Sequence, residues 1–306
     1  MSRIENALNR SRAAQEPPAG IGAVPKGTPE AELFVGPWEV GTESAAQPPA
    51  VPAGAPAEAA PASSTGRIVV TRPSGLHHHE NIEEKLVASG NPTAAAIEQY
   101  RRLAAKLHQA QVDRQLNSLM VVSAVSGEGK TLTSINLALT LSSSYKRRVL
   151  LVDADFRRPS LHEAFGLGIT AGLQEAVLNP PESGEMAFAF EVAPGVALLP
   201  AGKPTNDPLG ALTAERMSTI LAEAKRSFDW VIVDTAPLAA LSDAHVLKDL
   251  VDGAVLVISA GHTHFELVER AVQTLGTDHI LGVVLNGVQD QEIDAAYGYA
   301  GYYPRK

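Results

Sequence analysis

Three segments of the chain contain side chains suited to binding and transferring phosphate. Residues 121–131 read V-V-S-A-V-S-G-E-G-K-T, an apolar run followed by a loop that ends in Gly129, Lys130 and Thr131. The backbone amides of such a loop, at a helix N-terminus, form a positive concavity for phosphate, while the lysine reaches the outer phosphates and the hydroxyl binds Mg²⁺. Ala124 stands where the pattern G-x-x-x-x-G-K-[ST] has its first glycine. The segment therefore predicts a P-loop with one departure.

The other two segments carry carboxylates at the ends of apolar runs. Residues 148–155 read R-V-L-L-V-D-A-D, and residues 230–234 read W-V-I-V-D. Buried parallel strands have this pattern where they deliver carboxylates to the carboxyl edge of a sheet. Asp153 and Asp155 are two residues apart, so on a strand both would point the same way, which is costly unless a metal or a cation pairs with them. Asp234 fits a Walker B acid that holds Mg²⁺ directly or through water.

Each of these acids also has a purely structural interpretation. Asp234 could cap the turn that follows its strand. Asp153 and Asp155 could cap a helix or form salt bridges with Arg157 or Arg158. The three segments together favour the phosphate site over these alternatives.

Alternating strand and helix patterns predict the fold that must position these side chains. Besides the strand before the P-loop, apolar runs predict strands at 67–71, 148–155, 196–199, 230–234, 254–259 and 281–286. Helix-period patterns follow the P-loop and recur near 212–225, 243–250 and 265–275. Asn91 and Pro92 would open another helix, and Ser160 with Glu163 would cap the helix after the second segment. This order predicts an α/β fold: a doubly wound, mostly parallel sheet with helices on both faces.

The composition divides the chain into four parts. Residues 1–15 have helical spacing and predict a short amphipathic helix, either a docking helix for a partner or a frayed terminus. Residues 16–66 are rich in Pro, Ala, Gly and Glu and predict a disordered linker. Residues 67–288 form the P-loop domain, and residues 289–306 form a flexible, tyrosine-rich tail.

Charge and residue usage exclude several classes of function. The 306 residues carry a net charge of −9 and no basic stripe, which argues against nucleic acid as a partner. The sequence has no cysteine, which excludes disulfides and thiolate metal sites. His77 to His79 are consecutive, and neighbours in sequence do not converge on one metal ion without further geometry. Since no run of about 18 apolar residues occurs, we expect a cytoplasmic protein whose membrane connection runs through a partner.

Tyrosines gather at the C-terminal end of the chain. Of the six tyrosines, four lie in the last ten residues among glycines, namely Tyr297, Tyr299, Tyr302 and Tyr303. Random placement would rarely produce such a cluster. A glycine-tyrosine tail with no chemistry of its own is the alternative interpretation.

Together the motifs resemble one family, the bacterial tyrosine kinases of exopolysaccharide and capsule loci, in particular the soluble tyrosine autokinases. The resemblance rests on A-V-S-G-E-G-K-T at 124–131, L-V-D-A-D-F-R-R-P at 151–159 and V-I-V-D-T-A-P at 231–237, and it extends from residue 91 to the C-terminus. It implies that ATP is bound by the phosphate loop and by two residues outside it: Ser126, Gly127, Glu128, Gly129, Lys130, Thr131, Leu132, Arg157 and Asn286.

The resemblance also implies roles for the acids and the tail. Lys130, Asp153, Asp155 and Asp234 would be catalytic, with Asp153 or Asp155 as the base that takes the tyrosine proton. A base is needed because a phenol, with a pKa of about 10, is a weak nucleophile at neutral pH. Thr131, Asp153 and Asp234 would serve Mg²⁺.

In this family the tyrosine cluster is the autophosphorylation substrate. From Asn286 to Tyr297 an extended chain spans at most about 35 to 40 Å, so transfer to a neighbouring copy is geometrically reasonable. The resemblance further implies a membrane-spanning activator of the chain-length-determinant type, a homo-oligomer, a cognate phosphatase and a role in exopolysaccharide synthesis or export.

Two positions depart from the family pattern. The oligomerising helix of the family often carries E-x-x-R-x-x-R, and here Glu98 and Arg101 fit while Ala104 replaces the last arginine. This replacement puts ring assembly through that contact in doubt. Ala236 replaces a proline that commonly follows the Walker B acid and threonine, a change that we expect to matter little.

Two other functions share the predicted fold. In partitioning or septum-positioning ATPases, nucleotide drives dimerisation, and a lysine that contacts the partner's phosphates aligns with Val125, which cannot make that contact. The tyrosine tail has no role in that class. A non-catalytic nucleotide-binding adaptor of a polysaccharide export complex is the second alternative, because intact motifs do not measure turnover.

Overall fold

The computed structural model describes residues 67–73, 85–87, 92–168, 171–179, 185–203, 205, 207–238 and 243–288. Four predictions lie outside these residues: the N-terminal helix at 1–15, the linker at 16–66, the histidines at 77–79 and the tail at 289–306. No helix in the described part of the chain combines the length and the apolar character that crossing a bilayer requires.

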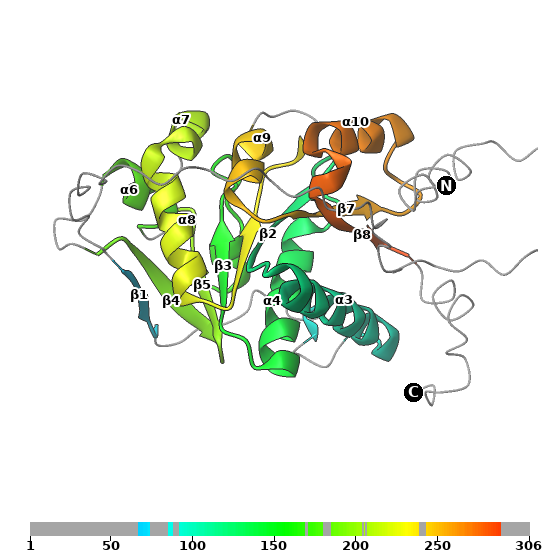
Figure 1. Cartoon of the computed structure of the whole chain (residues 1–306), viewed down its shortest axis with the longest axis horizontal. Coiled ribbons are helices and arrows are strands. Elements are labelled where there is room, and N and C mark those ends of the chain that lie inside the picture. Colours follow the sequence, from blue (N-terminus) through cyan, green and yellow to red (C-terminus); the bar gives the residue numbers. More distant parts are fainter. Residues whose placement is uncertain are drawn as a thin grey trace, which may run out of the picture.

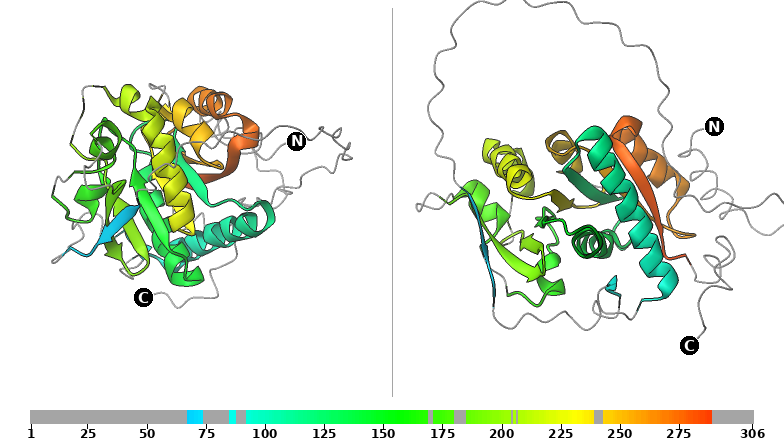
Figure 2. Two further views of the ribbon diagram at one scale, coloured as in Figure 1. Left: turned by 60° about the vertical axis from the view of Figure 1, so that its left-hand side comes forward. Right: turned by 60° about the horizontal axis from the view of Figure 1, so that its bottom comes forward.

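The described residues build one eight-stranded sheet in the order β1-β4-β5-β3-β6-β2-β7-β8 (Figure 1). Its strands are β1 (Ile68–Thr71), β2 (Ser118–Ser123), β3 (Val149–Asp153), β4 (Ala187–Ala193), β5 (Val196–Leu199), β6 (Trp230–Asp234), β7 (Ala254–Ser259) and β8 (Ile280–Asn286). All neighbouring strands are parallel except the β4–β5 pair. Figure 2 shows β1 at one outer edge of the sheet and β8 at the other. The predicted mostly parallel sheet is confirmed.

Helices cover both faces of the sheet. On one face lie α3 (Ala94–Arg114), α4 (Lys130–Tyr145) and the short α5 (Leu161–Ala164). On the other lie α6 (Leu173–Leu178), α7 (Pro208–Thr213), α8 (Glu215–Ser227), α9 (Asp243–Leu247) and α10 (Phe265–Leu275), with 3₁₀ turns at Lys248–Leu250 and Thr277–His279. In Figure 1, α7, α9 and α10 lie along the top of the molecule and α3 lies at the lower right. The doubly wound arrangement is therefore confirmed as well.

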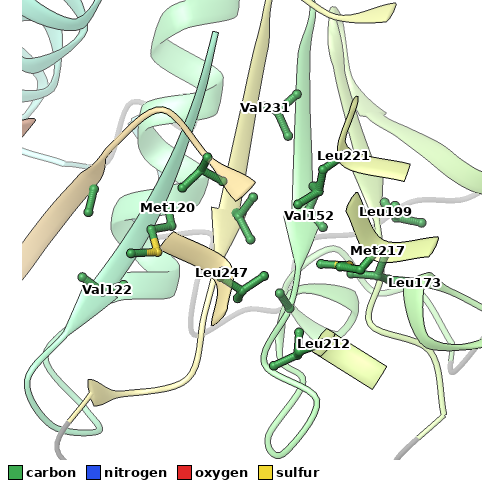
Figure 3. Packing of buried hydrophobic residues seen from close by; sticks show 14 of the residues in the cluster. Met120, Val122, Val152, Leu173, Leu199, Leu212, Met217, Leu221, Val231 and Leu247 are labelled. Atoms are coloured by element: carbon green, nitrogen blue, oxygen red, sulfur yellow. The ribbon is translucent and has the colours of Figure 1, made fainter. Parts of the chain in front are cut away.

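The central strands bury side chains on both faces, which explains their unbroken apolar runs. In β2, Met120 and Val122 pack with the helices α6 to α10, while Leu119 and Val121 face α3 and α4. Figure 3 shows the first of these layers, in which Met120, Val122 and Val152 lie near Leu247 and the residues of α7 and α8. Because helices cover both faces of the central strands, side chains that bind a ligand must come from the strand ends and from the loops that follow them.

The structure corrects several predicted elements. The single helix predicted at 212–225 is two helices, because Ala214 has an extended backbone with ψ of 136° between α7 and α8. The helix predicted at 243–250 changes to a 3₁₀ turn after Leu247. The helix predicted from Asn91 and Pro92 begins at Ala94, where Thr93 Oγ1 accepts the amide of Ala96 at 3.2 Å.

Strand β4 and helix α6 were not predicted. Strand β4 reads A-F-A-F-E-V-A and pairs antiparallel with β5 in the half of the sheet that ends at β1. Its apolar run is interrupted by Glu191, and the strand is only partly covered, with Phe188 36% exposed. The Ala-Phe alternation is the signal that could have identified it.

The departure from the family pattern at Ala104 lies at a buried position. Ala104 is 0% exposed and packs with Leu107 of α3 against apolar residues of α4 such as Leu141. Arg101 is exposed and lies 3.7 Å from a carboxylate oxygen of Glu98. An arginine at position 104 of this helix would therefore point into the core and not at a neighbouring copy.

We predict that Ala104→Arg destabilises the fold, whereas Ala105→Arg does not. Ala105 is the adjacent residue of α3 and is exposed. Overfilling the core and burying a charge should cost Ala104→Arg about 3 kcal/mol of unfolding free energy, and Ala105→Arg should stay within about 0.5 kcal/mol of the parent. Urea denaturation measures both. Equal stability of the two variants would contradict the assigned orientation of α3.

Candidate active site

The phosphate loop joins the end of β2 to the start of α4. Gly127 and Gly129 have φ of 88° and 90°, a left-handed conformation that glycine adopts without strain. At Gly129 a Cβ would also lie 2.1 Å from Asn286 Nδ2, so a larger residue would have to displace that side chain. Ala124, in place of the first glycine, is 0% exposed, and its φ is not positive. The departure in the motif is therefore compatible with the loop, because the backbone at that position does not require glycine.

The P-loop lysine lies among carboxylates at the carboxyl edge of the sheet. Lys130 is 9% exposed, and its Nζ lies 3.3 Å from Asp234 Oδ2 and 3.4 Å from Asp155 Oδ2. The same Nζ lies 3.3 Å from Thr131 Oγ1. Burial lowers the pKa of Lys130, but the attraction of Asp234 and Asp155 outweighs that effect, and the net pKa is raised. Lys130 is therefore a fixed positive charge in this site.

Asp234 receives hydrogen bonds from the first turn of α4. Thr131 Oγ1 donates to Asp234 Oδ2 at 2.7 Å, and Ser134 Oγ donates to Asp234 Oδ1 at 3.1 Å. Ser134 was not predicted, although its place four residues after Lys130 puts it one helical turn further along the same face. Asp234 is 0% exposed, and its carboxylate oxygens are hydrogen-bonded to the P-loop helix. The alternative interpretation, in which Asp234 caps the turn after its strand, does not describe these bonds.

Asp153 lies beside Asp234 and caps α5. The two residues are register partners on the neighbouring strands β3 and β6. Asp153 Oδ2 accepts the backbone amides of Ser160 and Leu161, both at 3.1 Å. Ser160 is the N-cap residue of α5, as predicted, but its side chain makes no capping bond, and the carboxylate of Asp153 accepts the helix amides in its place.

Asp155 lies beyond the end of β3 and has different partners from Asp153. Its Oδ2 forms the ion pair with Lys130, and its Oδ1 accepts the backbone amide of Arg158 at 3.0 Å. The amide of Asp155 itself donates to Asp153 Oδ1 at 3.2 Å. Because β3 ends at Asp153, Asp155 is not a strand residue. The expectation that both carboxylates point the same way along a strand therefore does not apply to it. The two acids thus lie at one edge but make separate contacts.

Three buried carboxylates share one lysine in this cluster. Burial raises the pKa of Asp153 to about 7, assisted by the negative charge of Asp234. Burial also raises the pKa of Asp234, against the opposing effect of Lys130 and the hydroxyl donors. The cluster is therefore short of positive charge. Within the described residues, no three His, Asp or Glu side chains form a closed metal cage. The carboxylate and hydroxyl oxygens nevertheless suit Mg²⁺, which often takes one or two carboxylates and completes its shell with phosphate and water.

The remaining predicted residues surround the loop. Asn286, the last residue of β8, donates from Nδ2 to the carbonyl oxygen of Glu128 at 2.8 Å. The Glu128 side chain is 2% exposed and faces away from the loop opening, whereas Ser126 and Gly127 are exposed. Leu132 lies in the first turn of α4, and its side chain packs against the hydrophobic core. Arg157 is exposed and follows the site acids directly along the chain.

Comparison with known proteins gives related sequences and folds. Residues 119–297, more than half of the chain, match the CobQ/CobB/MinD/ParA nucleotide binding domain family, CbiA. The chain is 36% identical over 222 residues to tyrosine-protein kinase YwqD of Bacillus subtilis, covering 72% of this chain and 92% of that protein. It is 34% identical over 228 residues to tyrosine-protein kinase Etk of Escherichia coli K12, covering 74% of this chain and 31% of that protein.

A solved structure supports the same relationship. The kinase domain of Escherichia coli tyrosine kinase ETK has a TM-score of 0.57 and 32% identity, over 64% of this chain and 77% of that domain. The chain therefore spans nearly all of YwqD but about a third of the full-length Etk protein.

The raised pKa of Asp153 predicts a pH-dependent stability in the protein without Mg²⁺ and nucleotide. The pKa rises from 3.8 to about 7 on folding, so the stabilising contribution of the protonated carboxyl is complete below the unfolded pKa. That contribution is lost as the pH rises through the folded pKa. Asp153→Asn cannot titrate, so the stability of the parent relative to this variant should fall by about 1 kcal/mol per pH unit between pH 4 and pH 7. Urea denaturation at three pH values measures the difference, and a constant difference would contradict the assignment.

Proposed function

Because the chain belongs to the bacterial tyrosine-protein kinases, within the CobQ/CobB/MinD/ParA nucleotide-binding domains, we propose that it is an ATP-dependent protein-tyrosine autokinase. The observation that carries this proposal is the position of Asp155, whose Oδ2 lies 3.4 Å from Nζ of the P-loop lysine. Transfer of a phosphoryl group to tyrosine needs the lysine, the Walker B acid and a carboxylate beside the phosphate that can take the phenol proton.

ATP would bind with its phosphates over the start of α4. The backbone amides from Ser126 to Leu132 and the Lys130 ammonium would hold the phosphates, with Arg157 and Asn286 at the periphery. Thr131, Asp153 and Asp234 would hold Mg²⁺, which when bound neutralises phosphate charge and orients the chain of phosphates. The support is the set of oxygen atoms gathered around Asp234 and the shortage of positive charge among the three acids.

Asp155 is the better candidate for the base that takes the tyrosine proton. Asp153 is 0% exposed and already accepts three backbone amides, two from the start of α5 and one from Asp155. Asp155 is 4% exposed, lies past the end of β3 and contacts the lysine. When Lys130 moves its ammonium toward the outer phosphate of ATP, it would release the Asp155 carboxylate. Tyrosine oxygen would then lose its proton to Asp155 as it attacks the outer phosphorus of ATP, while the bond from that phosphorus to the bridging oxygen breaks and ADP leaves.

The substrate that we propose is the tyrosine cluster of the tail, at Tyr297, Tyr299, Tyr302 and Tyr303. The described chain leaves the sheet at Asn286, whose side chain contacts the P-loop. An extended chain from Asn286 to the first tail tyrosine spans at most about 35 to 40 Å, a length that would allow the tail to reach the site of a neighbouring copy. We therefore propose transfer in trans within a homo-oligomer.

The cellular role that we propose is the regulation of exopolysaccharide synthesis or export. The support is the set of three motifs shared with kinases of exopolysaccharide loci. By the same reasoning, a membrane-spanning protein of the chain-length-determinant type would activate the kinase and recruit it from the cytoplasm to the inner face of the membrane. A cognate phosphatase would reverse the modification. Nucleic acid is not an expected partner, because the chain is acidic.

Substitution of the site residues tests the catalytic proposal. The purified protein is incubated in Mg-ATP with and without the activator, and phosphotyrosine is mapped by mass spectrometry. We expect Lys130→Met to lower the rate by at least about 10²-fold through loss of charge stabilisation, and Asp155→Asn by about 10² to 10⁴-fold through loss of the base. Asp278→Asn, an exposed carboxylate in the 3₁₀ turn before β8, should leave the rate unchanged.

Two outcomes would contradict the catalytic proposal. Unchanged labelling in both site variants would place the chemistry elsewhere. ATP hydrolysis with no phosphotyrosine in the activated protein would favour the switch function of partitioning ATPases.

Substitution of the tail tests the proposed substrate. Replacement of all four tail tyrosines by Phe should remove most phosphotyrosine and leave the affinity for ATP unchanged, since phenyl rings keep the size of the side chains. Tyr100→Phe and Tyr145→Phe are the matched controls, because these are the other two tyrosines of the chain. Mixing the Lys130→Met protein with the four-Phe protein then tests transfer in trans. Labelling of the Lys130→Met tail is the expected result, and its absence would indicate transfer in cis.

A further inference from the structure

The side chain of Glu128 is buried behind the phosphate loop. Glu128 lies between the two glycines of the loop, yet it is 2% exposed. Its Oε2 accepts the amide of Val125, at the other end of the loop, at 2.7 Å. A buried carboxylate is costly unless hydrogen bonds replace those that it made with water. Glu128 therefore closes the loop on itself, and its remaining oxygen requires donors from elsewhere.

Those donors come from the turn between β7 and α10. Glu128 Oε1 accepts a hydrogen bond from the hydroxyl of Thr263, and it lies 3.3 Å from the amide nitrogen of Ser259. Thr263 is 4% exposed, although the neighbouring residues Gly261, His262 and His264 are exposed. Thr263 also stays close to its own turn, with Oγ1 3.1 Å from the amide nitrogen of Ser259. One buried residue of an otherwise exposed turn thus reaches the phosphate loop.

This contact compensates for the flexibility of the loop. Gly127 and Gly129 permit the left-handed backbone of the loop but lose more conformational entropy on ordering than other residues. Phosphate binding depends on amides that already point in the right direction, because groups that are ordered only on binding lower the affinity. A hydrogen bond to a carboxylate is about twice as strong as one between neutral groups. Glu128, which lies between these two glycines, is the residue that the stronger hydrogen bonds hold in place.

We propose that Glu128 and Thr263 are positioning residues that hold the phosphate loop in its nucleotide-binding conformation. Thr263 would act through Glu128 and not by contact with the nucleotide, since its hydroxyl lies behind the loop. The inference rests on the proposed binding of ATP, and it gives the turn between β7 and α10 a role in that binding. Asn286 supplies a second brace by donating to the carbonyl oxygen of Glu128 at 2.8 Å.

Substitution of Thr263 tests the proposal. Thr263→Val removes the hydroxyl and keeps the shape, whereas Thr263→Ser keeps the hydroxyl. We expect Thr263→Val to raise the Kd and the KM for ATP about tenfold, as the loss of one hydrogen bond to a charged group predicts, with kcat at saturating ATP within about twofold of the parent. Thr263→Ser should restore most of the affinity. Thr219→Val is the matched control, because Thr219 lies on α8 in a separate part of the chain and is exposed.

The readouts separate this inference from the proposed function. Calorimetric titration with Mg-ATP, circular dichroism without nucleotide and steady-state kinetics are measured on the same preparations. Failure of the parent protein to bind ATP would refute the proposed function. If the parent binds ATP and folded Thr263→Val binds it equally well, only this inference is refuted. Should Thr263→Val not fold, Glu128→Gln keeps the length of the side chain and removes its charge. An unchanged Kd in that variant would equally overturn the proposal.

Discussion

The register of β3 against β6 is the constraint on which the site depends. It places Asp153 directly beside Asp234, both fully buried, at the carboxyl edge of the sheet. Two such charges repel each other and lose solvation, so the fold tolerates them only with strong partners. Lys130 supplies a charge, Thr131 and Ser134 supply hydroxyl donors, and the start of α5 supplies amides. The P-loop helix and α5 are therefore positioned by the same pair of acids.

The order of the strands brings the rest of the site to this pair. Strand β2 lies between β6 and β7, so the loop that leaves it has Asp234 on one side and the turn after β7 on the other. Lys130 reaches Asp234 from the start of α4, while Glu128 reaches Thr263 in the turn. Beyond β7, the end of β8 brings Asn286 to the loop. The loop is thus held from both sides by residues distant in sequence, as expected where parallel strands end at one edge.

Much of this arrangement could be predicted from the sequence, and the failures have physical causes. The strands at 196–199, 230–234 and 254–259 have the predicted bounds, because burial on both faces leaves an unbroken apolar run. Strand β4 is only partly covered, and Glu191 interrupts its apolar run. The lysine, the hydroxyl and the acids of the site follow from local motifs. The bond between Glu128 and Thr263 joins residues 135 positions apart, and no local pattern specifies it.

The end of a strand decides how two similar acids differ. Had β3 continued to Asp155, both carboxylates would share one direction and compete for the same cation. Because β3 ends at Asp153, that carboxylate stays with the α5 amides, and the chain turns so that Asp155 meets Lys130. Three acids around one lysine would repel the phosphates of ATP unless more positive charge accompanies them. On the proposed function, nucleotide and divalent cation would therefore enter together, and Lys130, once released from Asp155, would supply its charge to the outer phosphate.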